Sequence, residues 1–297
     1  MILLFIVFPG SGCRVGRRVP RSGACEDGRV PHDIRLIAVD MDGTLLDASG
    51  NVPETLWGLL PRLEERDVTF VPASGRQLAT LRATFGDAAD AMTFIAENGA
   101  YVVRAGVEVA SDALEPAVVA RAVQRLRRLS AEGYDLGVVV CGKRSAYIER
   151  TDEAFRSQAA IYYAALEIVD DVLAIDDDVL KIAVYDFALA EDSVGRALDE
   201  IAETHRVVVS GQHWVDIMNP GVDKGVALRR LQAALDVTPA QTVAFGDYLN
   251  DLEMLDAAAW SFAMHNAHPD VVARARHRAP SNVDHGVITT IEDLLAG

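Results

Sequence analysis

The sequence is poor in cysteine, in lysine and in long apolar runs. Its 297 residues include three cysteines, Cys13, Cys25 and Cys141, whose number and spacing fit neither a disulfide framework nor a zinc site. This cysteine usage is typical of the reducing cytoplasm, which is the expected location. Only three of the 28 basic residues are lysines, so arginine is the default cation of this chain.

Positive charge is also scarce, because 28 basic residues face 44 acidic ones and the net charge is −16. So acidic a chain would repel a phosphate backbone, which excludes nucleic acid as an expected partner. The apolar run at residues 1–8 is far shorter than the roughly 20 residues that cross a bilayer. Its arginines follow it, whereas a secretory signal begins with them. We therefore expect no membrane partner.

Residues 1–32 differ from the rest of the chain. The stretch 10–29 is rich in glycine, arginine, serine and proline and has no apolar period, which predicts a disordered N-terminal extension. Two interpretations stay open: an upstream extension of the true gene product, or a membrane-targeting tail. We expect deletion of residues 1–29 to leave folding and activity intact.

From Ile34 onward, short apolar runs alternate with amphipathic stretches. Strands are predicted at 36–39, 68–71, 94–96, 242–245 and 261–264, and helices at 53–66, 77–85, 224–235 and 269–275. We expect Pro61 to kink or restart the first helix. This alternation predicts an α/β fold with a Rossmann-like, doubly wound parallel sheet.

Residues 100–217 follow a different pattern. Strands are predicted at 137–141, 180–185 and 206–209, around helices at 114–129 and 191–205. These features indicate an α+β domain inserted into the first. The expected division is a core of residues 33–98 and 219–297, with an inserted cap of residues 99–218.

Polar residues stand where the predicted core strands end. Asp40 and Asp42 follow the first strand, and Ser74 follows the second. In an extended chain, residues two apart face the same side, so both carboxylates can address one ligand while Met41 points into the core. Ligands of parallel sheets bind beyond the carboxyl ends of the strands, which makes this edge the candidate site.

A second acidic group follows the strand at 242–245. Asp247 and Asp251 add two carboxylates, and Asn250 adds an amide. Four acids at one sheet edge would repel one another unless a cation lay among them, and hard oxygen ligands suit Mg²⁺.

These segments resemble the four signatures of the haloacid dehalogenase superfamily. Residues 40–46 read DMDGTLL, residues 74–76 read SGR, Lys224 stands at the third signature, and residues 246–251 read GDYLND. The long insertion between Ser74 and Lys224, with ENGA at 97–100 and GVDKG at 221–225, is similar to the Cof-like subfamily and its α+β cap. Two departures are Tyr248-Leu249 in the fourth signature and His265 before Asn266.

The resemblance implies a role for each signature residue. Asp40 would be the nucleophile and Asp42 the general acid and base. The implied phosphate-binding residues are Gly43, Ser74, Gly75, Lys224 and Asn250. The implied Mg²⁺ ligands are Asp40, the backbone carbonyl of Asp42, Asp247 and Asp251.

The expected function is a Mg²⁺-dependent phosphatase that hydrolyses small phosphorylated metabolites through an aspartyl-phosphate. Sugar phosphates are the first candidate substrates, and a phosphorylated cofactor such as flavin mononucleotide or pyridoxal phosphate is the second. A sugar-phosphate phosphomutase and a non-catalytic sugar-phosphate sensor remain alternatives. The sequence does not indicate the oligomeric state.

Outside the signatures, simpler interpretations are favoured. Lys181 follows Asp176-Asp177-Asp178, which favours a local ion pair. His213 and Trp214 lie on a predicted strand and are expected to pack in the ordinary way. Cys141 is expected to be an inert buried thiol.

Overall fold

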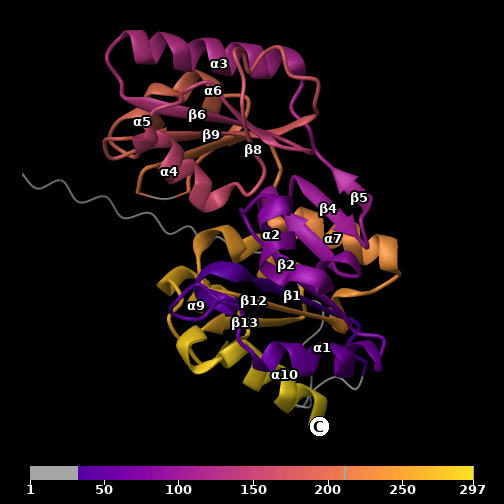
Figure 1. Ribbon diagram of the computed structural model, residues 1–297. Coiled ribbons are helices and arrows are strands. Elements are labelled where there is room, and N and C mark those ends of the chain that lie inside the picture. The colour runs from indigo at the N-terminus through magenta and orange to yellow at the C-terminus, as the bar shows by residue number, and fades with distance from the viewer. Residues whose placement is uncertain (1–32, 211, 297) are drawn as a thin grey trace, which may run out of the picture. The chain divides into compact units, whose positions relative to one another are not determined.

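The computed structural model describes residues 33–210 and 212–296, so the prediction for residues 1–32 lies outside it. The larger sheet has eight strands (Figure 1). In spatial order they are β14 (His277–Ala279), β13 (Trp260–Met264), β12 (Thr242–Gly246), β1 (Leu36–Asp40), β2 (Thr69–Ala73), β3 (Thr93–Ala96), β4 (Tyr101–Arg104) and β5 (Val107–Ser111). Pairing is parallel from β14 to β3 and antiparallel for β4 and β5. The predicted α/β sheet is confirmed.

Helices cover both faces of this sheet because β1 is apolar on both sides. Ile37 and Val39 pack in one layer with α1 (Thr55–Glu64), α2 (Leu78–Phe85) and α10 (Gly286–Ala296). Leu36 and Ala38 pack in the other with α7 (Lys224–Leu235), α8 (Leu252–Ala257) and α9 (Pro269–Arg274). The helix does not restart at Pro61, since α1 continues through it as one helix, and the expected kink stays a prediction.

A second sheet of six strands forms within the insertion. In spatial order they are β10 (Arg206–Val209), β11 (Trp214–Met218), β9 (Val179–Asp186), β6 (Leu136–Gly142), β7 (Ala146–Ile148) and β8 (Leu166–Ile168). One face packs with α3 (Pro116–Ala131) and the other with α4 (Glu153–Tyr162). Residues 116–218 therefore build an α+β unit, which we call the cap.

Two details of the predicted insertion need correction. The helix expected at 191–205 is two short pieces, α5 (Val194–Ala197) and α6 (Asp199–Ala202), because the backbone of Leu198 leaves the helical region between them. The hairpin of β4 and β5 belongs to the larger sheet. By sheet membership, the insertion thus begins after Ser111 rather than at residue 99.

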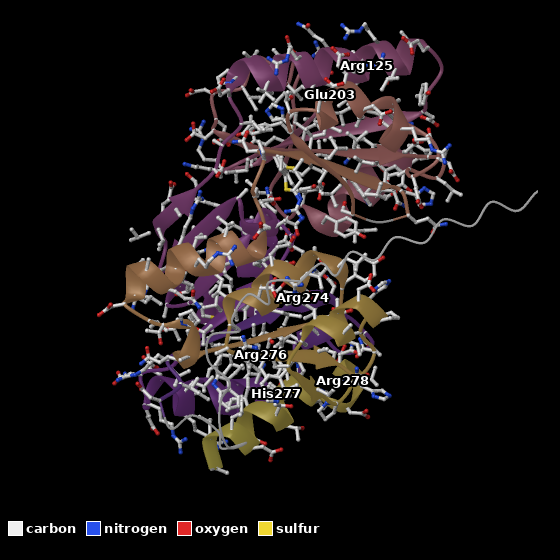
Figure 2. The ribbon with its side chains drawn as sticks, turned by 180° about the vertical axis from the view of Figure 1, so that it is seen from behind. Arg125, Glu203, Arg274, Arg276, His277 and Arg278 are labelled. Carbon is white, nitrogen blue, oxygen red and sulfur yellow. The ribbon has the colours of Figure 1, made fainter. Side chains whose placement is uncertain are left out.

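Charged side chains on the edge strand β14 oppose its pairing with a strand of another molecule. Arg276, His277 and Arg278 are exposed on and beside it, and Figure 2 shows their side chains at this edge. Charged residues on an edge strand oppose pairing with another sheet. His277 also stacks on Trp260, with ring centroids 5.3 Å apart. Across the described ranges, no helix has the length and apolar character needed to cross a membrane.

Candidate active site

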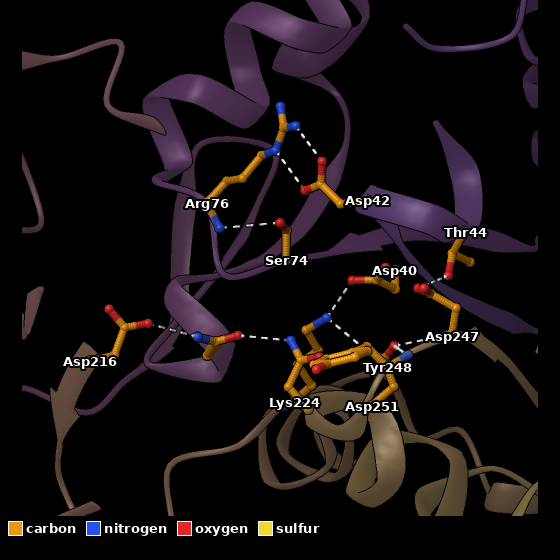
Figure 3. A network of polar contacts seen from close by, with 12 residues as sticks. Asp40, Asp42, Thr44, Ser74, Arg76, Asp216, Lys224, Asp247, Tyr248 and Asp251 are labelled. Carbon is orange, nitrogen blue, oxygen red and sulfur yellow. Dashed lines mark hydrogen bonds and ion pairs between the residues drawn. The ribbon is translucent and has the colours of Figure 1, made fainter. Parts of the chain in front are cut away.

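Three carboxylates meet at the carboxyl edge of the larger sheet. Asp40 ends β1, Asp247 follows β12, and Asp251 ends a short 3₁₀ turn before α8. One carboxylate oxygen from each lies within 4.8 Å of the others (Figure 3). The predicted convergence therefore holds for these three residues.

The cation beside this cluster is Lys224, the first residue of α7. Its Nζ lies 2.5 Å from Asp40 Oδ1 and 2.7 Å from Asp251 Oδ1, and the side chain is fully buried (Figure 3). Burial alone would lower the pKa of Lys224, but the carboxylates of Asp251 and Asp40 outweigh it and raise the pKa. Lys224 thus stays charged. Asp223 fixes its position by capping α7, because its Oδ1 accepts a hydrogen bond from the backbone N–H of Val226.

One ammonium does not balance three carboxylates. Burial, followed by repulsion from Asp251, raises the pKa of Asp40 well above its ordinary value. Burial is also the main cause that raises the pKa of Asp247 to about 6, against a hydrogen bond donated by Thr44. A divalent cation among these oxygens would oppose both shifts, and three clustered carboxylates are a hard-oxygen donor set. The residues present therefore fit Mg²⁺.

Asp42 lies apart from the cluster of three. Its Oδ1 and Oδ2 accept hydrogen bonds from Arg76 Nη2 at 2.5 Å and Nε at 2.9 Å. Its side chain is 59% exposed, whereas that of Arg76 is 20% exposed. The backbone N–H of Arg76 donates to Ser74 Oγ at 3.1 Å, so the turn after β2 joins Ser74 to Asp42 (Figure 3). The expectation of four converging carboxylates is reduced to three, with the fourth held by arginine.

Gly43 is required by the close approach of Asp247. Its φ is +79°, and a Cβ there would lie 2.4 Å from Asp247 Oδ2. Any side chain would displace that carboxylate from the cluster. The carbonyl of Gly43 accepts a hydrogen bond from Asn266 Nδ2 at 2.8 Å, which fixes the turn after β1.

A cavity of about 500 Å³ opens over this edge. Its core wall contains Asp40, Asp42, Ser74, Gly75, Arg76, Asn98, Asp247, Tyr248 and Asn250. Its cap wall contains Gln158, Tyr162, Tyr163, Lys181, Tyr185, Ser210, Gln212, His213, Trp214 and Asp216. Lys224 and Asp251 are fully buried and are not among the residues that line the cavity, whereas Asp40, the partner of Lys224, lines it.

The cap contributes a buried charge cluster that sequence reasoning missed. Lys181 Nζ lies 2.8 Å from Glu97 Oε2 and 3.7 Å from Asp216 Oδ2, and it donates to the carbonyl of Gly75 at 2.9 Å. The expected local pair with residues 176–178 is therefore wrong. Asp178 instead pairs with Lys143.

An amide chain connects the same cluster to the fourth signature. Asn250 Nδ2 donates to Asn98 Oδ1 at 3.3 Å, and Asn98 Nδ2 donates to Asp216 Oδ2 at 3.4 Å. Asn250 is thus tied to the cap as well as placed on the cavity wall.

Two further interpretations can be compared with the structure. His213 and Trp214 line the cavity, whereas the sequence favoured ordinary strand packing for both. Cys141 is buried as expected, and burial raises the pKa of its thiol, which disfavours the reactive thiolate.

Gln77 and Thr80, at the start of α2, dock the cap onto the core. Gln77 Nε2 donates to the carbonyl of Ala165 at 2.9 Å, and Gln77 Oε1 accepts from the N–H of the same residue at 3.0 Å. Thr80 Oγ1 donates to the carbonyl of Tyr162 at 2.7 Å and accepts from the N–H of Ala164 at 3.0 Å. Four hydrogen bonds therefore join two core side chains to the main chain at 162–165.

This fold and site define a class of enzymes in which a parallel α/β sheet carries a carboxylate cluster beneath an inserted cap. The family described as haloacid dehalogenase-like hydrolase matches residues 37–291, and the chain belongs to this family. The Escherichia coli K12 relative YbjI, a 5-amino-6-(5-phospho-D-ribitylamino)uracil phosphatase, is 36% identical over 265 residues. The match covers 88% of this chain and 96% of YbjI.

Solved structures agree with this assignment. SMU.1108c from Streptococcus mutans is 29% identical, with a TM-score of 0.78 over 89% of this chain and 100% of that one. The subclass IIB sugar phosphatase BT4131 is 18% identical and shares the fold, with a TM-score of 0.71 over 87% and 98% of the two chains. The resemblance to the Cof-like phosphatases is confirmed, and the chain is a phosphoric monoester hydrolase.

Proposed function

We propose that this chain is a Mg²⁺-dependent phosphatase of small phosphorylated metabolites that works through an aspartyl-phosphate on Asp40. The observation that carries the proposal is the cluster of Asp40, Asp247 and Asp251, of which Asp40 and Asp247 line a cavity on whose wall Asp42 also lies. A metal site beside a reachable nucleophile and a separate proton donor is what hydrolysis of a phosphate ester requires.

Asp40, Asp247, Asp251 and the backbone carbonyl of Asp42 would hold the Mg²⁺. Bound there, the ion would neutralise charge on the transferring phosphoryl group. Lys224 supports the same site from behind, since it balances part of the negative charge and orients Asp40.

Asp40 attacks phosphorus with a carboxylate oxygen, so an acyl-phosphate bond forms as the ester P–O bond breaks. Asp42, after it leaves Arg76 and takes a proton from solvent, gives that proton to the departing alkoxide. It then takes a proton from the water that attacks the aspartyl-phosphate, which releases inorganic phosphate and restores Asp40. A general acid of this kind contributes about 10²–10⁴-fold.

The phosphate-binding residues surround this path. Ser74 and Gly75 lie in the turn after β2, and Asn250 also lines the cavity. Backbone N–H groups beside Gly43 would face the phosphoryl oxygens, as in other anion-binding turns. Lys224 acts on the phosphoryl group through Asp40 and by its field.

The relative YbjI, by its name, removes phosphate from a ribityl phosphate that carries a uracil ring. We extend to this chain the general class, a phosphate monoester of a small metabolite. Release of inorganic phosphate from a metabolite panel, with Mg²⁺ and with EDTA, tests the proposal. Asp40→Asn should be inactive. Asp87→Asn is the control and should have the activity of the parent protein, because Asp87 is exposed and does not line the cavity. A folded protein that releases no phosphate from any ester would overturn it.

The panel also separates the alternatives. A phosphomutase would return the phosphoryl group to a sugar and release little phosphate, and a sensor would bind sugar phosphates without turnover. The accessible position of Asp42 on the cavity wall favours hydrolysis, since a base there can activate water.

A further inference from the structure

The cap wall of the cavity is aromatic. Five ring-bearing residues of the cap line it: Tyr162, Tyr163, Tyr185, His213 and Trp214. The core wall is mostly acidic and polar, and Tyr248 is its one ring among the residues described. The cap wall therefore offers apolar π-faces, which a phosphate group cannot use.

Trp214 is at the centre of this aromatic group. Its ring lies 5.0 Å from that of Tyr185 and 5.5 Å from that of Tyr162, at interplanar angles of 68° and 75°. Tyr163 makes a third edge-to-face contact, at 6.4 Å. Such contacts hold the indole in one orientation without a ligand, so little side-chain freedom is lost when a ligand binds.

The burial of these rings divides them into a fixed base and a usable surface. Tyr163 and Tyr185 are buried, whereas Trp214 is half-buried and Tyr162 is 39% exposed. Trp214 and Tyr162 thus offer ring surface to a ligand, and the buried tyrosines support them from behind.

Polar groups lie beside the rings. Gln158, Ser210 and Gln212, which come from the same cap wall, also line the cavity. An amide can both donate and accept, so these groups suit the edge of a heterocycle that carries carbonyl and N–H groups. Apolar faces with a few polar groups at their margin are typical of pockets for small organic ligands, and about 500 Å³ is within the usual range of such pockets.

We propose that the preferred substrates of this chain carry a planar heterocyclic ring that stacks on Trp214 and Tyr162 while the phosphate ester lies at Asp40. This inference rests on the proposed phosphatase function and narrows its substrate class. Rings that meet at steep angles favour a flat π-system over a puckered sugar, because the flat ring gains both a stacked and an edge contact. Trp214 and Tyr162 are then specificity-determining residues.

Two phosphate esters that differ only in the ring make the test sharp. Flavin mononucleotide and ribitol 5-phosphate both present a ribityl chain with a terminal phosphate, so the bond that breaks and the leaving alcohol match. We expect kcat/KM with Mg²⁺ to be on the order of 10- to 100-fold higher for flavin mononucleotide, the range that stacking on an aromatic side chain gives for a base. Glucose 6-phosphate serves as the sugar-ring comparison.

Variants identify the surface responsible. Trp214→Leu should reduce the advantage of flavin mononucleotide toward unity and leave kcat/KM for ribitol 5-phosphate within about twofold, while Trp214→Phe keeps most of the advantage. Tyr162→Leu, at the more exposed ring, should have a smaller effect in the same direction. Trp260→Leu is the matched control, because Trp260 stacks on His277 at β14 instead of lining the cavity.

Riboflavin, which has the ring but no phosphate, separates this inference from the phosphatase proposal. Its fluorescence should be quenched on binding to the parent protein and much less on binding to Trp214→Leu. Hydrolysis of ribitol 5-phosphate or glucose 6-phosphate as fast as flavin mononucleotide, with no riboflavin binding, would overturn the ring site and leave the phosphatase intact. Riboflavin binding that depends on Trp214, with no hydrolysis of any ester, would support the ring site and overturn the phosphatase.

Discussion

Arg76 donates two hydrogen bonds from its guanidinium to the carboxylate of Asp42, at 2.5 and 2.9 Å. Planar, two-point contact fixes both the position and the rotation of a carboxylate, which a single ammonium cannot do. The same arginine is tied to Ser74 through its own backbone N–H. The turn after β2 thus holds Asp42 as a carboxylate, the form in which it would act as a base, beside the proposed phosphate-binding residues.

Loss of the two hydrogen bonds from Arg76 to Asp42 should impair proton transfer. We expect Arg76→Ala to lower kcat for an alkyl phosphate by about 10- to 100-fold, within the range that a positioned general acid contributes. Arg76→Lys should recover little, because it restores charge but not two-point contact. Steady-state kinetics measures both, with Arg82→Ala on α2 as the control. Equal activity of Arg76→Lys and the parent would show that a positive charge beside Asp42 is sufficient and that two-point contact is not needed.

Asp40 and Asp42 should fail in different ways. Asp40→Asn should form no phosphoenzyme, since a neutral amide is a poor nucleophile toward phosphorus. Asp42→Asn should still give a burst of nitrophenol from nitrophenyl phosphate, because that leaving group scarcely needs a proton, and phosphoenzyme should then accumulate. Rapid-quench measurements on an activated and an alkyl ester distinguish the two. A burst from Asp40→Asn equal to that of the parent would refute the nucleophile assignment.

Mg²⁺ should stabilise the folded protein by relieving repulsion among Asp40, Asp247 and Asp251. Thermal unfolding should shift to higher temperature as Mg²⁺ is added and return after EDTA, because a ligand of the native state stabilises it by mass action. Asp247→Asn removes one negative charge but keeps an oxygen, so it should need more Mg²⁺ for the same shift and the same activity. If its activity stayed low at every Mg²⁺ concentration, Asp247 would have a direct part in the chemistry.

Lys181 and Lys143 form a matched pair for stability. Lys181→Met leaves the buried carboxylates of Glu97 and Asp216 without their cation and should cost about 3–5 kcal/mol of unfolding free energy. Lys143→Met breaks ion pairs with the exposed carboxylates of Glu108 and Asp178 and should cost under about 1 kcal/mol. Urea unfolding measures both losses.

A second substitution tests the cause of the larger loss. Adding Glu97→Gln to Lys181→Met removes one of the two stranded charges, so part of the lost stability should return. No recovery would attribute the loss to packing of the lysine stem instead.

The sequence predicted which edge of the sheet carries the carboxylate cluster because the signal is local. Asp40, Asp42 and Asp247 follow buried strands directly, and the rule that parallel strands end together at a ligand site needs no knowledge of the cap. Met41 is buried as predicted, although it begins the helical turn Met41–Leu45 instead of continuing an extended strand.

The ion-pair partners of Lys181 could not be predicted from the local sequence. Three acids precede it in the chain, yet its partners come from the segment after β3 and from β11. Sequence distance favours charges that are close in the chain as predicted partners. A buried charge instead pairs with those that the fold brings into the same buried region, however distant they are in sequence. Cytoplasmic location and the domain division at residues 33–98, 99–218 and 219–297 remain predictions, the second adjusted by the pairing of β4 and β5 with the larger sheet.

The docking by Gln77 and Thr80 has a consequence for how such an enzyme diversifies. Both side chains bond only main-chain atoms at 162–165, and every residue type except proline supplies the same N–H and C=O groups. Substitutions at Tyr162 or Tyr163 can therefore alter the wall that faces the substrate while the hydrogen bonds to α2 persist. In Tyr162 the main chain attaches the cap and the side chain faces the substrate, so a related enzyme can change its substrate without losing this contact between cap and core.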